Sequence, residues 1–343
     1  MTQLTERKGR VLRFIVSDYI STASPVASGA VARASGLHIS PATARSEMGA
    51  LEEGGYILRP HISAGGIPSD RGYRHFVDSL DPAATADLDD AGAVQANLAL
   101  SRHDFVAWAD GAASALAALL GSLAFATTPR EPAPLVKGIE LLKLQEMIIM
   151  LVVVLREASV HRELISLDRP VTGQELEHAR NRLSETVTGK TAEDLRAAAH
   201  AAADPLDQKV LESTAEVLRL RDAEALGERV FQGLRRLLEQ PEFAADPVRA
   251  RNVVATIEDA AAFGGLADQA PGDGSAVTFI GAENKQEALR GVSVVLCRYG
   301  VAGEAQGVIG LVGPTRMAYS RALPVIKYAA DSLGAIAGRV YGP

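Results

Sequence analysis

A short segment around position 45 combines one arginine with small residues at helical spacing. On a helix that turns about 100° per residue, Ala44, Met48 and Leu51 share one apolar side. The roughly opposite side carries one cation among small residues, namely Ala42, Arg45, Ser46 and Gly49. Such a side lets a helix backbone approach base-pair edges, and the guanidinium can reach a guanine or a phosphate. The segment therefore predicts a helix that binds in the DNA major groove.

Hydroxyl groups and two further polar side chains extend this candidate DNA-binding surface. Ser40 and Thr43 could bind phosphates or bases, and the N-terminus of the helix itself attracts phosphate. Arg59 and His61 follow the helix and could contact the DNA backbone or the adjacent minor groove. A solvated polar face, or a winged helix that binds protein instead of DNA, remains an open alternative for the same pattern.

The elements around this segment predict a helix-turn-helix. Apolar residues at helical spacing predict a first helix over residues 4–20, with Thr5 as its N-cap. A short second helix is expected over Val26–Ala34. The third begins at Ser40-Pro41, where serine caps and proline takes the first helical position, and ends at Gly54-Gly55.

The residues after the third helix predict a wing. Two extended segments, Tyr56–Arg59 and Ile67–Pro68, flank a glycine pair at Gly65-Gly66. Ser69-Asp70 then caps a fourth helix that runs to about Leu80. Together these elements predict an N-terminal winged helix-turn-helix domain over residues 1–82.

The remainder of the chain predicts two groups of strands separated by helices. Helices are expected at about 87–101 and 104–124, and the Ala-rich stretch Ala112–Ala126 is interpreted as a buried helix. The first strands form an antiparallel meander, and everything from Gly173 to about Gln240 is expected to be helical. The later strands precede a last helix at about Met317–Val340. The expected strands are Gly138–Leu144, Met147–Leu155, Ser159–Leu167, Ala276–Gly281, Gly291–Tyr299 and Gly303–Val312. The fold class is therefore α+β, with one α/β domain that contains a helical insertion.

Composition and charge limit the possible functions. The 343 residues are 47% hydrophobic and carry a net charge of −7, yet residues 1–80 alone have nine Lys/Arg against seven Asp/Glu. Only this N-terminal part could supply cations to phosphates. The longest apolar run, Met147–Leu155, is far too short to cross a membrane, and the N-terminus does not resemble a signal peptide. We therefore expect a cytoplasmic protein.

Four other features suggest chemistry and do not support it. Thr188–Thr191 resembles the end of a phosphate-binding loop but lacks the required preceding glycine. Gly313–Arg316 fits a turn better than an anion-binding nest. The single cysteine, Cys297, excludes a disulfide framework and fits a buried strand position. The histidines have no metal-ligand spacing; these are His161, His178 and His200. We expect no catalytic residue, no metal, no cofactor and no enzyme.

Four sequence segments resemble one known family along the whole chain. Residues 40–80, SPATARSEMGALEEGGYILRPHISAGGIPSDRGYRHFVDSL, resemble the N-terminal domain of the HrcA heat-inducible transcription repressors. QPEF at 240–243, FIGAEN at 279–284 and GPTRMAYSR at 313–321 resemble later signatures of that family, in the same order.

The resemblance implies a fold and a function. It implies a homodimer that binds the inverted-repeat CIRCE operator in double-stranded DNA upstream of chaperone operons, and whose activity depends on the chaperonin GroEL. It also implies a GAF-like domain, here residues 86–189 and 249–343, and an inserted dimerising domain, here residues 190–248. We expect the dimer contacts to include apolar residues of this insertion: Leu206, Val210, Leu218, Phe231, Leu234 and Leu238.

The chain departs from the family pattern near the DNA-binding segment. Ala44 and Ser46 stand where the family usually has Ile and Asn, and Gly66 stands where it usually has Arg. Asn is a good adenine contact, so Ser46 could alter base preference, and a cation missing at Gly66 would remove one DNA contact. The operator sequence is therefore left open, as are direct sensing of temperature and the DNA competence of the free dimer. An alternative function is a regulator whose GAF-like domain binds a small molecule, although no ligand-contacting residue can be named.

Overall fold

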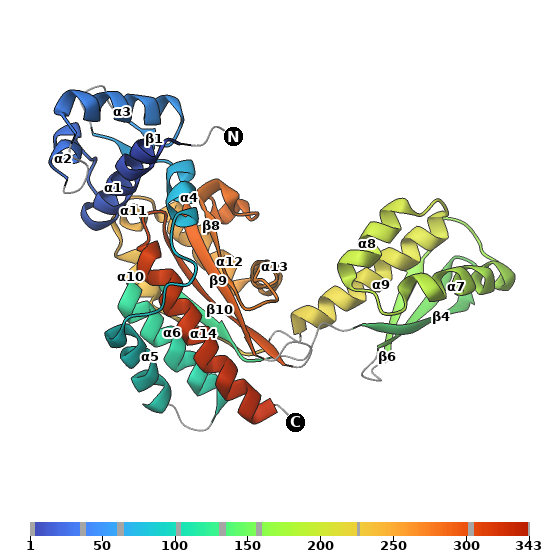
Figure 1. Ribbon diagram of the computed structural model, residues 1–343. Helices are drawn as coiled ribbons and strands as arrows, with labels where there is room; N and C mark the ends of the chain where they lie inside the picture. The colour runs from blue at the N-terminus through green and yellow to red at the C-terminus, as the bar shows by residue number, and fades with distance from the viewer. Residues whose placement is uncertain are drawn as a thin grey trace. The chain divides into compact units, whose positions relative to one another are not determined.

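The computed structural model describes residues 4–34, 39–59, 65–100, 104–129, 135–155, 160–224, 227–300 and 305–341. Over these residues the fold is α+β, and its strands pair in antiparallel sheets. The chain divides into two compact units (Figure 1). The first unit comprises residues 1–129 and 228–343, and the second comprises residues 130–227.

The N-terminal part of the first unit confirms the expected order of elements. Three helices are followed by a two-stranded antiparallel pair and a fourth helix. The predicted caps Thr5, Ser40 and Ser69 each accept a hydrogen bond from a backbone N–H of the first turn that follows. The elements are α1 (Glu6–Thr22), α2 (Ser28–Arg33), α3 (Pro41–Glu53), β1 (Ile57–Leu58), β2 (Ile67–Pro68) and α4 (Asp70–Asp78).

A five-stranded antiparallel sheet forms the centre of the first unit, in the order β7-β3-β10-β9-β8. Helices α6 and α14 pack on one face, and α5 packs against these two helices (Figure 1). Phe263 of α13 packs edge-on against Phe125 and Phe231 on the other face. The strands are β3 (Leu123–Thr127), β7 (Arg229–Gln232), β8 (Ala276–Ile280), β9 (Val292–Gly300) and β10 (Gln306–Pro314). The helices are α5 (Leu88–Leu100), α6 (Phe105–Leu120), α10 (Leu234–Leu238), α11 (Pro241–Ala244), α12 (Pro247–Glu258), α13 (Ala260–Ala267) and α14 (Tyr319–Tyr341).

Two strands of this sheet differ from the sequence expectation. The Ala-rich stretch is not one helix: α6 ends at Leu120, its C-cap Gly121 adopts a left-handed conformation, and Leu123–Thr127 then forms the buried strand β3. Arg229–Gln232, expected to be helical, pairs with β3 as strand β7. Strand β3 is a short, fully buried apolar run without polar alternation, so its pattern does not distinguish a strand from a helix.

The second unit contains its own sheet and core. Strands β4 (Val136–Gln145), β5 (Ile148–Leu155) and β6 (Val160–Ser166) form the expected antiparallel meander. One face of this sheet packs with helices α7 (Gly173–Val187), α8 (Ala192–Ala201) and α9 (Pro205–Glu224) around a separate apolar core.

The expected domain boundaries therefore need correction. The sequence predicts one domain from residues 86–189 and 249–343, but β4, β5 and β6 pair only with one another within the described part of the chain. The inserted unit runs from 130 to 227 and includes a sheet, and 228–248 belong to the first unit. The inward residues of β5 find their apolar partners on the helices that follow directly in sequence, which closes a local core.

Candidate nucleic-acid interface

Helix α3 buries the side that the sequence predicted. Ala44, Met48 and Leu51 are at most 1% exposed and belong to the core of the first unit. Ser40 starts the helix, because its hydroxyl accepts a hydrogen bond of 3.1 Å from the Thr43 N–H, and Pro41 occupies the first turn. The apolar side and the cap thus fix which side of the helix is presented outward.

The opposite side of α3 is open. Ala42, Arg45 and Ser46 are exposed, and Thr43 and Gly49 are partly exposed. Within the described part of the chain, no carboxylate pairs with the Arg45 guanidinium. The arginine can therefore extend from a surface of small side chains, as a groove-binding helix requires.

An ion pair that sequence reasoning missed ties α3 to the first helix. Glu47 is 5% exposed, and its carboxylate accepts a hydrogen bond of 2.6 Å from Nε of Arg7 in α1. A buried carboxylate without a cation would be costly, so this pair supports the orientation of α3. The sequence indication of this ion pair was Glu47 itself, an acidic residue next to the apolar side of the helix.

The two predicted contacts after the helix differ. Nε of Arg59 lies 3.3 Å from Oε2 of Glu52, so a carboxylate partly neutralises this cation. His61 lies outside the described residues. Gly66 pairs with Val26, and a Cβ there would lie 2.9 Å from Cδ1 of Ile57. A Cβ at position 66 would therefore point toward Ile57 and Met48. The loss of one DNA contact at Gly66 stays a prediction.

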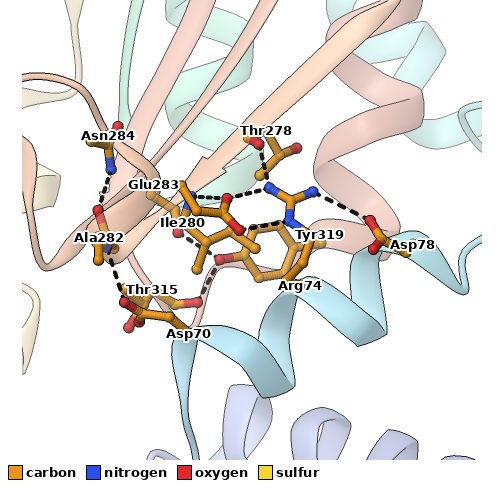
Figure 2. Close-up of polar contacts among 12 residues, drawn as sticks. Asp70, Arg74, Asp78, Thr278, Ile280, Ala282, Glu283, Asn284, Thr315 and Tyr319 are labelled. Carbon is orange, nitrogen blue, oxygen red and sulfur yellow. Dashed lines mark hydrogen bonds and ion pairs between the residues drawn. The ribbon is translucent and has the colours of Figure 1, made fainter. Parts of the chain in front are cut away.

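Helix α4 joins the DNA-binding candidate to the five-stranded sheet (Figure 2). Arg74 donates from Nε to Oε1 of Glu283 at 2.8 Å and from Nη2 to the Thr278 carbonyl at 2.5 Å, and it also pairs with Asp78. Asp70 accepts a hydrogen bond of 3.0 Å from the Ala282 N–H. We call the contacts of Asp70 and Arg74 with residues 278–283 the α4 junction.

The charges of the junction stabilise one another. Burial alone would raise the pKa of Glu283, but hydrogen bonds from Arg74 and from the Ile280 N–H outweigh it and hold the pKa below its ordinary value. The hydrogen bond to Glu283 in turn raises the pKa of Arg74. Both groups therefore stay ionised at neutral pH.

Buried aromatic and polar groups lie beside the junction. The rings of Tyr73 and Tyr319 are 6.0 Å apart, and the Tyr319 hydroxyl is 2.6 Å from both the Ser293 hydroxyl and the Thr315 carbonyl. The amide of Asn284 donates to three backbone carbonyls that shape the 281–292 loop. One apolar core continues from α1 and α3 through α4 into the sheet.

In the sequence, the residues of the junction belong to separate segments, each of which resembles a part of the HrcA family. In the structure, segments 69–76, 279–284 and 313–321 meet at this one place. Arg316 pairs with Glu242 at 2.5 Å and with Gln240 at 2.7 Å, so segment 313–321 also contacts segment 240–243. Because the Glu242 carboxylate already pairs with Arg316, this contact also argues against an anion site at Gly313–Arg316.

The predicted dimer residues are mostly internal. Leu206, Val210 and Leu218 are at most 6% exposed and belong to the core of the second unit, so their side chains are not available to another copy. Phe231 lies in β7 and packs with Phe125 and Phe263 in the first unit. Leu234 and Leu238 lie in α10, also in the first unit, and Leu238 is 37% exposed. Helical spacing of apolar residues indicated burial correctly, but not burial against a partner.

The remaining sequence features have structural roles. Cys297 is buried in β9, and burial raises the pKa of its thiol to about 12. Thr191 caps α8 together with Asp194, which accounts for the Thr188–Thr191 string.

Among the described residues there is no metal-binding group of His, Cys, Asp or Glu. In that same part of the chain, no helix has the length and hydropathy to span a membrane.

Comparison with known proteins gives a family. The model of the HrcA protein C-terminal domain matches residues 107–323. The heat-inducible transcription repressor HrcA of Dehalococcoides mccartyi strain 195 is 34% identical over 99% of this chain and 97% of its own length. That of Herpetosiphon aurantiacus is 35% identical over the same shares of the two chains.

A solved structure supports the fold. A crystal structure of a hypothetical protein at 2.2 Å resolution aligns with a TM-score of 0.61 and 22% identity, over 97% of this chain and 98% of that chain. The family match covers more than half of the sequence, and the relatives align along nearly its whole length. The chain belongs to the HrcA family of heat-inducible transcription repressors.

Proposed function

We propose that this chain represses chaperone operons by binding the inverted-repeat CIRCE operator as a homodimer, with GroEL as the modulating partner. The proposal depends mainly on one observation, the exposed side of α3 with Arg45 among small residues. The order α1-α2-α3-β1-β2 is that of a winged helix, in which the third helix enters the major groove. The five-stranded sheet with its helices corresponds to the GAF-like domain.

The second unit offers a surface for the homodimer. The outer face of its sheet carries a cross-strand row in which Leu142 and Leu164 flank Met150. Leu142 is 49% and Leu164 is 64% exposed, and Val160 on the same face is 52% exposed. Contiguous exposed apolar side chains mark interaction surfaces. We place the dimer contact here, on a second copy of the same face, in place of the helix residues proposed from sequence.

Footprinting tests the operator proposal. The full-length protein is titrated on the promoters of the chaperone genes of its own genome, with and without added GroEL, at two salt concentrations. We expect protection of an inverted repeat, stronger with GroEL, and an affinity that falls steeply with salt because phosphates are neutralised. Equal affinity for the promoter and for an unrelated duplex would refute operator binding.

A groove supports a second candidate function, sensing of a small molecule. It has a volume of about 550 Å³ and lies between the end of α4, residues 80–84, β8 and α14. Its wall combines apolar side chains such as Leu80 and Leu323 with charged groups of both signs, namely Arg74, Lys327, Asp78 and Asp81. A thermal-shift screen of metabolites tests it, since a ligand raises the melting temperature of the state that it binds. GroEL dependence of DNA binding without any such ligand favours the first function.

A further inference from the structure

Helix α4 holds the C-terminal end of α3 through its first turn. Arg71 donates from Nη1 to the Gly54 carbonyl at 2.8 Å, and its guanidinium lies 4.4 Å above the centre of the Tyr56 ring. The Ser69 hydroxyl donates to the Gly55 carbonyl at 2.6 Å. These groups bind the carbonyls of Gly54 and Gly55, the two residues that directly follow the last residue of α3. Movement of α4 would therefore move α3.

The same helix is fixed to the sheet by its other side (Figure 2). Arg74 bonds the Glu283 carboxylate through two nitrogens and the Thr278 carbonyl through one of them, and Asp70 accepts from the Ala282 N–H. The side chains of Arg74 and Glu283 are 30% and 34% exposed. A two-pronged arginine–carboxylate pair fixes direction as well as distance.

Close backbone approach restricts sliding of the helix on both sides. A Cβ on Gly72 would overlap the Tyr56 carbonyl oxygen, and a Cβ on Gly281 would overlap the Asp70 carboxylate. Gly281 also has φ of +53°, a left-handed conformation that favours glycine. The helix is thus packed without spare space between the end of α3 and the 281–283 turn.

We infer that Arg74 and Asp70 are positioning residues for DNA binding, which set the orientation of α3 relative to the five-stranded sheet. The inference rests on the proposed function, because orientation matters when two α3 helices must reach two half-sites of one duplex. Once one α3 of a dimer has bound its half-site, a fixed geometry holds the other α3 near the second half-site at high effective concentration, which favours binding of both. A half-site, bound by one α3 alone, does not depend on that geometry.

Comparison of full-site and half-site binding tests the inference. Fluorescence anisotropy measures the affinity of each protein for two duplexes, one with both operator arms and one with one arm scrambled. The proteins are the wild type, Arg74→Met, Arg74→Lys and Glu283→Gln. Arg235→Met is the matched control, since Arg235 also pairs with a carboxylate four residues later but lies away from the junction, 92% exposed. The wild type should prefer the two-arm duplex by at least about 10²-fold, within the range for linked sites.

The expected result is selective loss of two-arm binding. Arg74→Met and Glu283→Gln each lower two-arm affinity by about tenfold and leave one-arm affinity within about twofold, because only the linked contact is lost. Arg74→Lys, which keeps the charge, recovers part of the loss, and Arg235→Met changes neither. Parallel loss on both duplexes, or no loss, overturns the positioning role. A wild type that does not distinguish the two duplexes refutes the proposed operator binding instead.

Discussion

Replacement of Gly72 by alanine examines the packing of α4 on the end of α3. Gly72 lies in the first turn of α4, and an added Cβ would overlap the Tyr56 carbonyl oxygen. Neither group is a flexible side-chain end, so α4 must shift by about 1 Å to restore ordinary contact, a shift of the size that overpacking imposes. Overpacking costs about 1–3 kcal/mol. The gain in helix propensity is at most about 1 kcal/mol.

We therefore expect Gly72→Ala to lower the free energy of unfolding by about 1–2 kcal/mol. Urea denaturation followed by circular dichroism measures this change, and the fluorescence of the single tryptophan, Trp108, gives a second probe. Gly92→Ala is the matched control, because Gly92 lies inside helix α5 with nothing within 4 Å of an added Cβ. The control should gain about 0.5–1 kcal/mol. Equal gains in both variants would refute the packing described for α4.

Three other perturbations follow from the structure. The stabilisation from Glu283 is complete above its ordinary pKa of 4.5 and is lost as pH falls through its lower folded-state pKa. Glu283→Gln should therefore flatten the acid side of a curve of unfolding free energy against pH. An unchanged acid side contradicts the pairing with Arg74. Cys297 should react with a thiol reagent at pH 8 only after unfolding, because its thiol is buried with a pKa of about 12; rapid reaction of the folded protein contradicts that burial. Leu164→Glu should weaken the proposed homodimer by at least about tenfold in sedimentation, because a charge would enter the proposed apolar contact, whereas Val248→Glu, also exposed, should not. Equal dimerisation of both variants would contradict the placement of the interface on the outer sheet face.

The sequence predicted local structure where a single residue type determines it. Ser40 followed by Pro41 has one favourable arrangement, the start of a helix, and the structure confirms it. The apolar positions Ala44, Met48 and Leu51 likewise had to face a core once the helix formed. The exposed side of α3, with Arg45, follows from these two facts.

The parts that could not be predicted depend on long-range pairing. Alternation along β5 indicates one buried face, yet nothing in it specifies whether that face meets the distant strand β10 or the nearby helix α9. The same ambiguity explains the strand β3, whose five residues are all buried. Burial of Val210 and Leu218 was foreseen, whereas the surface that buries them was not.

The α4 junction shows a different limit. Arg74 and Glu283 are separated by 209 positions, and each by itself has the composition of an ordinary surface residue. Arg74 lies in segment 40–80 and Glu283 in segment 279–284, which both resemble one family, but the resemblance did not single out either residue. Their contact in the fold gives the resemblance of these two segments a physical meaning.

The most direct test of the account measures how Arg45→Ala changes affinity for the inverted-repeat operator at fixed salt. Arg33→Ala, a change of another N-terminal arginine, is the control for a general loss of positive charge. The account predicts that Arg45→Ala costs about 1–3 kcal/mol and relaxes discrimination at one base position in each half-site. Wild-type affinity and unchanged base preference for Arg45→Ala would contradict the claim that the exposed side of α3 binds DNA.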